Sequence, residues 1–176
     1  MNTFDNKRKK ESCERIERTF IELIQTRELN EIKVSDICKK AELNRSTFYS
    51  NYIDIYDLAD KVKEELFNEV LSLYPKEVES GTHSYDFLKL LEHIYENQLF
   101  YKTYFKLSYG EDCDLVRAMA ENSGFERYFD NKENAYYHIT FFMYGFNAVI
   151  KKWLHYGCKE SPEDILNIIK EEYRRK

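Results

Sequence analysis

The sequence has few residues that interrupt helices, and it has no long apolar run. Only five glycines and two prolines occur in 176 residues, and a chain with so few breakers favours helices. No apolar stretch approaches the roughly 20 residues that a membrane-spanning helix needs. The first eleven residues are polar and charged, without the apolar segment of a signal peptide. These absences predict an all-α, cytoplasmic protein that makes no contact with a membrane.

The cysteines do not form a recognisable metal or redox motif. The four thiols, at Cys13, Cys38, Cys113 and Cys158, are scattered, and no two of them make a C-x-x-C pair. Zinc sites and redox pairs usually need such close spacing. We therefore expect free thiols, no metal and no cofactor.

The sequence also lacks the signatures of an enzyme. Its histidines, His83, His93, His138 and His155, do not form an H-E-x-x-H motif or accompany a nucleophile motif. The glycines are too far apart to form a phosphate-binding loop. We expect His138 to be a core or interface residue, and we expect the protein not to be an enzyme.

Charge is distributed unevenly along the chain. The formal net charge is −5, with a balance of +2 over residues 1–50 and −7 over residues 51–176. A relatively basic N-terminal part on an acidic remainder fits a DNA-binding head on an acidic body. The basic cluster Lys7–Lys10 is either the solvated start of a helix or a segment that contacts DNA phosphates.

The N-terminal part contains a long helical pattern followed by two short ones. Apolar residues recur at helical spacing and predict helices over residues 6–27, 34–41 and 45–52. Asp54 is placed to cap a fourth, longer helix that ends near Pro75, and Asp57 resembles the partner residue of a capping box.

The rest of the chain predicts a second, larger helical domain. Residues 75–84, which include Pro75 and Gly81, are the expected boundary. The predicted domains are thus 1–54, a linking helix at about 54–74, and 75–176. Helices are expected over residues 85–107 with a break after Asn97, 114–121, 134–156, and from Ser161 to the C-terminus. The helix at 134–156 is apolar on two faces, as in a bundle centre or a dimer seam.

The two short helices form a helix-turn-helix pattern. Three residues, Glu42-Leu43-Asn44, join them, and this spacing is typical of DNA-binding motifs. The second helix begins Arg45-Ser46-Thr47. Such donors and acceptors at a helix N-terminus can meet base edges in the major groove.

The rest of this short helix contains residues that could bind phosphates and residues that could anchor it. Tyr49 and Asn51 can donate hydrogen bonds to phosphates. Phe48 and Tyr52 lie four residues apart and are expected to anchor the helix to the core. The alternative is a capped surface helix with no role in DNA binding.

These residues carry a specific family resemblance. The run Val34-Ser35-Asp36-Ile37, followed by Leu43–Tyr49 and Asp57-Leu58, resembles the TetR/AcrR family of regulators over about residues 10–70. The remainder is similar to the short C-terminal domain of a subgroup that includes regulators of dihydroxyacetone kinase operons. The pieces that carry this second resemblance are Phe100-Tyr101-Lys102, Tyr144-Gly145-Phe146, Trp153-Leu154, Gly157 and Ser161-Pro162-Glu163.

The resemblance implies an N-terminal three-helix helix-turn-helix head and a C-terminal helical bundle that dimerises through its last two long helices. It implies that a homodimer reads a near-palindromic site in double-stranded DNA. The family's DNA contacts map onto Lys33, Ser35, Arg45, Ser46, Thr47, Tyr49 and Asn51. The chain departs from the family at Ile55, where a phosphate-binding Lys is usual, and at Asn51, where His is usual. The first departure puts one phosphate contact in doubt.

Members of this family often bind a small-molecule effector in the body. Aromatic side chains that could line such a pocket are Tyr95, Tyr101, Tyr104, Phe105, Tyr137, Phe141 and Tyr144. They could equally fill a small core without a cavity, and the sequence names no ligand.

The sequence thus predicts a DNA-binding transcriptional regulator, a homodimeric repressor that an effector could relieve. The alternative is a protein-interaction adaptor of the same fold, whose body recruits a partner protein. Steep salt dependence of binding to duplex DNA is expected only of the first.

Overall fold

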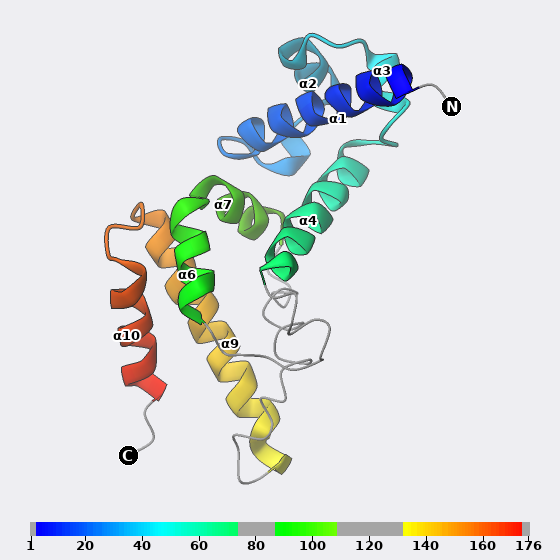
Figure 1. Ribbon diagram of the computed structural model, residues 1–176. Coiled ribbons are helices and arrows are strands. Elements are labelled where there is room, and N and C mark those ends of the chain that lie inside the picture. The colour runs from blue at the N-terminus through cyan, green and yellow to red at the C-terminus, as the bar shows by residue number, and fades with distance from the viewer. Residues whose placement is uncertain (1–2, 74–86, 109–131, 174–176) are drawn as a thin grey trace. The chain divides into compact units, whose positions relative to one another are not determined.

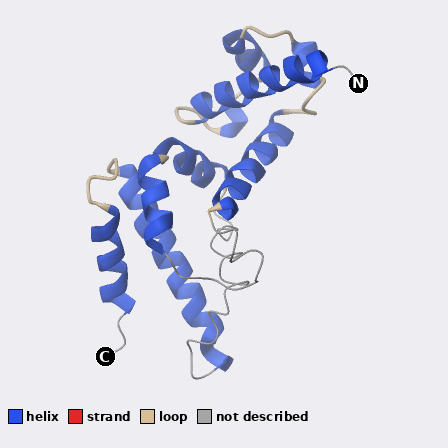
Figure 2. Ribbon diagram, viewed as in Figure 1, coloured by secondary structure: helices blue, strands red, loops and turns tan. Residues whose placement is uncertain are grey.

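The described part of the chain is helical throughout. The structure is a computed structural model that describes residues 3–73, 87–108 and 132–173. Every regular element within these ranges is a helix, and no strand occurs among them (Figure 1, Figure 2). The all-α prediction is therefore confirmed.

The chain forms two compact units, Met1–Glu65 and Leu66–Lys176. The helix α4 (Ile55–Ser72) begins in the first unit and ends in the second. The other elements of the first unit are α1 (Thr3–Ile24), the short 3₁₀ helix η1 (Leu29–Glu31), α2 (Val34–Ala41) and α3 (Arg45–Tyr49). The expected bounds of α2 are thus confirmed.

Two helices of the first unit differ from prediction in their ends. The helix α1 begins at Thr3 and ends at Ile24, both earlier than predicted, and the amides of Thr26 and Arg27 close its last turn on the Leu23 carbonyl. The helix α3 ends at Tyr49 instead of Tyr52. Side-chain groups of Ser50 and Asn51 donate to the Thr47 carbonyl, and such bonds compete with the continuation of a helix.

Apolar side chains from each helix of the first unit meet in one core. Helix α1 packs against α2, and α2 packs against α3. The fully buried apolar side chains of this unit are Ile16, Phe20, Ile24, Ile37, Phe48 and Leu58. A five-residue helix such as α3 is far below the roughly 12–15 residues that an isolated helix needs in water, so α3 depends on this packing.

The second unit contains α6 (Phe87–Glu96), α7 (Gln98–Leu107), α9 (Lys132–His155) and α10 (Pro162–Tyr173). The predicted break after Asn97 is confirmed, since α7 begins at Gln98. The expected domain boundary at 75–84 and the expected helix at 114–121 lie outside the described residues.

The helix α9 has one buried and one exposed aromatic face. Helix α6 packs against α7 and α10, and α7 packs against α9. Phe142, Phe146 and Trp153 of α9 are buried. Tyr137 and Phe141 are exposed, the latter to 74%. The predicted two-sided apolar character of this helix is therefore present, with one side left uncovered by the described part of its own chain.

The end of α9 and the start of α10 are closed by residues next to them in the chain. Gly157 follows α9 with a φ of +78°, a left-handed conformation that glycine adopts without strain. The Ser161 hydroxyl accepts from the Asp164 amide at 3.1 Å, and Asp164 Oδ2 accepts from the Ser161 amide at 3.2 Å. These reciprocal bonds form the capping box of α10.

The turn between α2 and α3 requires a left-handed residue. Glu42 adopts φ 54° and ψ 45°, and the Leu43 amide then donates to the Cys38 carbonyl at 2.9 Å. A residue with a Cβ atom pays a conformational cost of roughly 1–2 kcal/mol in this region. The Glu42 side chain is largely exposed and pairs with Arg15 at 3.7 Å, and an ion pair this exposed contributes little.

We expect Glu42→Gly to raise the free energy of unfolding by about 0.5–1 kcal/mol, because glycine adopts the left-handed conformation without the Cβ clash. Urea denaturation of the two proteins measures the difference. The control Lys39→Gly, inside α2, should instead lower the free energy by about 1 kcal/mol. Equal destabilisation by both substitutions would contradict the strain assigned to Glu42.

Candidate nucleic-acid interface

Two aromatic residues hold α3 on the first unit. Phe48 is fully buried, with a relative exposure of 0%, and its ring lies 5.5 Å from the Tyr52 ring between centroids. The Tyr52 hydroxyl donates to Glu17 Oε1 on α1 at 2.5 Å. Burial, and then the neighbouring Glu17 carboxylate, raise the pKa of Tyr52. The predicted anchoring role of Phe48 and Tyr52 is confirmed.

The expected DNA contacts in and just after α3 have two different environments. Arg45, Ser46 and Tyr49 are exposed, Tyr49 to 58%. Tyr49 follows Arg45 by four residues and Ser46 by three, so the three side chains share one face of the helix. Thr47 and Asn51 are half-buried. The exposed face therefore offers a guanidinium and two hydroxyls to a partner.

The side chain of Asn51 forms hydrogen bonds with residues just before it in the chain. Its amide nitrogen donates to the Thr47 carbonyl at 2.7 Å and to the Ser50 hydroxyl at 3.3 Å. Its Oδ1 atom is buried without a hydrogen-bond partner. The amide hydrogens thus close the end of α3, and a phosphate contact by Asn51 would require this side chain to leave both partners.

The two remaining predicted contacts lie at the start of α2. Lys33 is exposed and occupies the N-cap position, and Ser35 is half-buried in the first turn. Neither Lys33 nor Asn44, the N-cap residue of α3, makes a side-chain cap hydrogen bond. Asp36 carries a negative charge in the first turn of α2, where it is favourable for the helix dipole. Its carboxylate also pairs with Arg27 at 2.9 Å.

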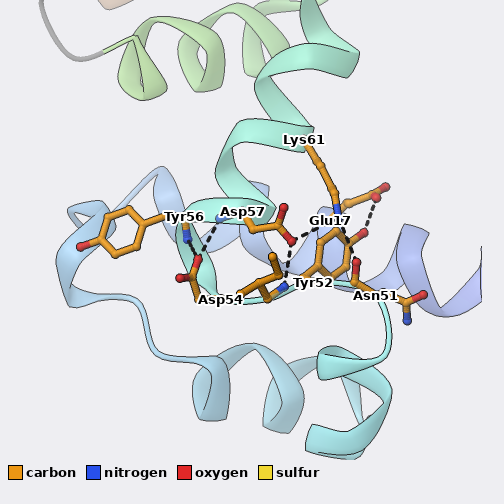
Figure 3. Close-up of polar contacts among 8 residues, drawn as sticks. Glu17, Asn51, Tyr52, Asp54, Tyr56, Asp57 and Lys61 are labelled. Atoms are coloured by element: carbon orange, nitrogen blue, oxygen red, sulfur yellow. Dashed lines mark hydrogen bonds and ion pairs between the residues drawn. The ribbon is translucent and has the colours of Figure 1, made fainter.

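The start of α4 is closed by two aspartates. Asp54 Oδ1 accepts from the amides of Tyr56 and Asp57 at 2.8 and 2.9 Å, and Asp57 Oδ2 accepts from the Ile53 amide at 2.8 Å (Figure 3). The predicted cap at Asp54 and its Asp57 partner are confirmed. Ile55, at the position of the family's usual lysine, is buried with 8% exposure and cannot present a charge to phosphate.

The basic cluster of the N-terminus is part of a helix. Residues 7–10 lie within α1 and are exposed, and Lys10 pairs with Glu14 at 3.9 Å. Positive charge near a helix N-terminus opposes the helix dipole. The position fits either a solvated first turn or a phosphate-contacting segment, and both interpretations stand.

Sequence reasoning missed Glu17 and Lys61, which complete this region. Lys61 Nζ donates to the Asn51 carbonyl at 3.0 Å and to Asp57 Oδ2 at 3.1 Å. The four-residue spacing from Asp57 to Lys61 is a recognisable helix pair and could have been found. Glu17 lies 35 residues from Tyr52, and no local pattern connects the two.

The aromatic residues proposed for an effector pocket are in different environments in the second unit. Tyr101 and Tyr104 on α7 are buried, and the Tyr101 hydroxyl lies 2.7 Å from His93 Nδ1. Tyr95 is exposed and its ring stacks on Trp153. The other members of the set are the half-buried Phe105 and the exposed Tyr137, Phe141 and Tyr144 of α9.

The described residues contain neither a metal site nor a membrane-spanning helix. Within them no cluster of three or more His, Cys, Asp or Glu side chains could hold a metal ion. None of the described helices is long and apolar enough to cross a membrane. Cys13, Cys38 and Cys158 are free thiols, and Cys113 lies outside the described residues. Burial raises the pKa of the Cys38 and Cys158 thiols, which keeps both in the unreactive protonated form.

Comparisons with known proteins concern the C-terminal region and the fold of the chain. A TetR-type family model, described as "Transcriptional regulator C-terminal region", matches residues 83–172, just over half of the chain. A solved structure titled "Dihydroxyacetone kinase operon activator DhaS" superposes with a TM-score of 0.59 at 19% sequence identity. The match covers 92% of this chain and 95% of that one, and at this identity it shows a shared fold. A sequence comparison with curated proteins finds no significant match.

The cap at the start of α4 should make the stability of the protein depend on pH. The Ile53 amide, and then Lys61, hold the pKa of Asp57 below its ordinary value. A lowered pKa in the folded state contributes stability above the unfolded pKa of about 4, and that contribution is lost as the pH falls. Asp57→Asn should therefore be less stable than the wild type at pH 7, with a difference that shrinks towards acid.

Urea denaturation at several pH values measures this difference. Asp60→Asn removes the same charge from the exposed surface of α4 and should give a smaller pH-dependent difference. A gap between wild type and Asp57→Asn that stays constant down to acid pH would disprove the ionic cap.

Proposed function

Because the chain belongs to the TetR family of transcriptional regulators, we propose that it binds a specific DNA sequence through α3 and regulates transcription there. The observation that carries the proposal is the exposed face of Arg45, Ser46 and Tyr49 on a helix whose opposite side is anchored by Phe48. An anchored helix with an exposed polar face is the arrangement that enters a major groove.

The proposed roles follow from the position of each group. Arg45, Ser46 and Thr47, at the N-terminal end of α3, are assigned to base edges, which carry sequence information. Lys33, Ser35 and the Tyr49 hydroxyl are assigned to phosphates, and Asn51 is assigned to them only after it leaves its partners in α3.

We propose that the protein acts as a homodimer. Tyr137, Phe141 and Tyr144 are exposed along one face of α9, and Ile168 is exposed on α10. Large exposed apolar patches usually mark interaction sites. An isologous dimer would cover these faces and pair two heads for a near-palindromic operator. We propose that the protein acts in the cytoplasm. Repression follows if the occupied operator overlaps a promoter.

An effector site is proposed only for the buried aromatic groups of the second unit. Tyr101 and Tyr104 combine buried rings with polar tips, and His93 lies at the Tyr101 hydroxyl. A ligand bound there could relieve repression if it prefers one of two states of the protein. We assign the exposed aromatics of α9 to the dimer instead.

A second candidate function is a protein-interaction adaptor. It is favoured by the acidic start of α4, where Asp54 and Asp57 flank the buried Ile55, because carboxylates there repel phosphates. The solved structure of similar fold is titled an operon activator, which leaves activation through a recruited partner as the rival to repression.

The proposed function is tested by fluorescence polarisation with the DNA beside the coding sequence, at two salt concentrations and with non-specific competitor. Competitor-resistant binding that weakens steeply with salt is expected, because phosphate contacts release counterions. Binding that competitor abolishes would favour the adaptor.

Substitutions on α3 should separate base contacts from phosphate contacts. Tyr49→Phe should weaken binding about fivefold for each protomer on every operator variant, because a lost phosphate bond of about 1 kcal/mol carries no sequence information. Arg45→Ala should weaken binding to the preferred operator by roughly 1–3 kcal/mol and relax the preference at one base pair. Titrations against an operator and its single-base variants measure both, and an equal loss on all variants for Arg45→Ala would reduce its role to a phosphate contact.

The proposed dimer predicts that a charge on the exposed face of α9 separates the subunits. Phe141→Glu should convert the dimer to a monomer, because dimer formation would bury the new carboxylate. Sedimentation velocity measures the change, with Leu99→Glu on the exposed surface of α7 as the control that should remain dimeric. A monomeric wild type, or a dimeric Phe141→Glu protein, would contradict the assignment.

A further inference from the structure

The C-terminal end of the recognition helix is tied to α4 by a single lysine. Lys61, in the second turn of α4, donates to the Asn51 carbonyl at 3.0 Å and to Asp57 Oδ2 at 3.1 Å. Its Nζ atom also lies 4.9 Å from the centroid of the Tyr52 ring. Figure 3 shows Lys61 extending from α4 towards Asn51, Asp57 and Tyr52, while Tyr56 points away from this group. One ammonium group thus contacts two residues that follow α3, Asn51 and Tyr52, and the capping residue Asp57 of α4.

These contacts are part of a polar network that spans three helices. Glu17 on α1 accepts from the Tyr52 hydroxyl, and Lys61 on α4 lies over the ring of the same residue. Asp57, which accepts from Lys61, also accepts from the Ile53 amide. The segment that leaves α3 is therefore held from α1 and from α4, and Lys61 is the one cation in the drawn cluster (Figure 3).

The position of Lys61 makes a direct role on DNA unfavourable. Asp54 and Asp57 form the N-terminal cap of α4, and Asp60 is exposed on the same helix. Phosphates that approached this end would meet these carboxylates first. The side chain of Lys61 is only 45% exposed and already donates to two oxygens.

We propose that Lys61 is a positioning residue for DNA recognition, which fixes the angle of α3 on α4 and does not bind phosphate. This inference rests on the proposed function, because it concerns the geometry with which α3 meets DNA. In place of the family's usual lysine, the chain has the buried Ile55. The cation at this junction is Lys61, which contacts other residues of the protein and holds α3 in position.

Two properties distinguish a positioning residue from a phosphate contact. A phosphate contact lowers the salt slope of DNA binding by about one unit for each protomer when it is removed, whereas a positioning residue leaves the slope unchanged. A positioning role should also be restored by arginine, which can donate to both oxygens and lie over an aromatic ring.

The experiment compares Lys61→Met, Lys61→Arg and Lys63→Met with the full-length wild type in salt-dependent operator titrations. Lys63 lies on the same helix, about 200° around its axis from Lys61, and is the matched control for loss of one positive charge. We expect Lys61→Met to weaken operator binding about fivefold, because α3 would then hold its binding-competent angle in only roughly a fifth of the molecules. Its salt slope should equal that of the wild type, and Lys61→Arg and Lys63→Met should stay within about twofold of it. All titrations are run well below the unfolding temperature of each protein.

Amide hydrogen exchange in the absence of DNA provides a second readout. Loss of the lysine should speed exchange at residues 50–52 in Lys61→Met and not in Lys63→Met. A salt slope that falls by about one per protomer would overturn the proposal in favour of a phosphate contact. Unchanged affinity, or unchanged exchange at residues 50–52, would also overturn it. A wild type without competitor-resistant DNA binding would refute the proposed function instead, and exchange would then still decide whether Lys61 holds the end of α3.

Discussion

The burial of Phe48 is the interaction on which the proposed DNA-binding face of the first unit depends. The helix α3 has five residues, and its isolated sequence could not remain helical in water. Full burial of one phenylalanine contributes roughly 1.5–3 kcal/mol, and the neighbouring Tyr52 adds a buried ring and a hydrogen bond to Glu17. Because these two residues face the core, Arg45, Ser46 and Tyr49 must face outwards.

Around α3, the positions of individual charged residues matter more than the net charge of the chain. The chain as a whole carries a formal charge of −5, and carboxylates dominate the start of α4. The groups proposed to approach DNA nevertheless include Lys33 and Arg45, which are exposed. Carboxylates at the α4 cap serve the protein's own backbone amides, and Lys61 neutralises one of them. Local charge at the recognition face can thus be favourable on an acidic protein.

Local signals in the sequence were sufficient to predict most of the described helices and the caps at several of their ends. The bounds of α2, the cap at Asp54 and the capping box of α10 follow from residues within a few positions of one another. The early end of α3 does not, because it depends on side chains that donate to the Thr47 carbonyl in competition with the helix. The engagement of Asn51 within α3 was missed for the same reason.

Contacts between distant segments could not be predicted from a single sequence. The bond from Tyr52 to Glu17 and the stacking of Tyr95 on Trp153 join residues far apart in the chain. The aromatic set of the second unit illustrates the limit, since the same residue types fill the core at Tyr101 and remain exposed at Phe141. Helical spacing identifies both faces of α9 as apolar, but only packing shows which one the chain covers itself.

The central claim is that the exposed face of α3 is where this regulator meets DNA. Amide hydrogen exchange of the full-length protein, with and without its operator, tests it most directly. The account predicts slower exchange in the presence of DNA over residues 33–52, with little change in α10. Protection confined to the second unit, or no protection at α3 under saturating DNA, would contradict the claim and make a protein partner the better explanation of this fold.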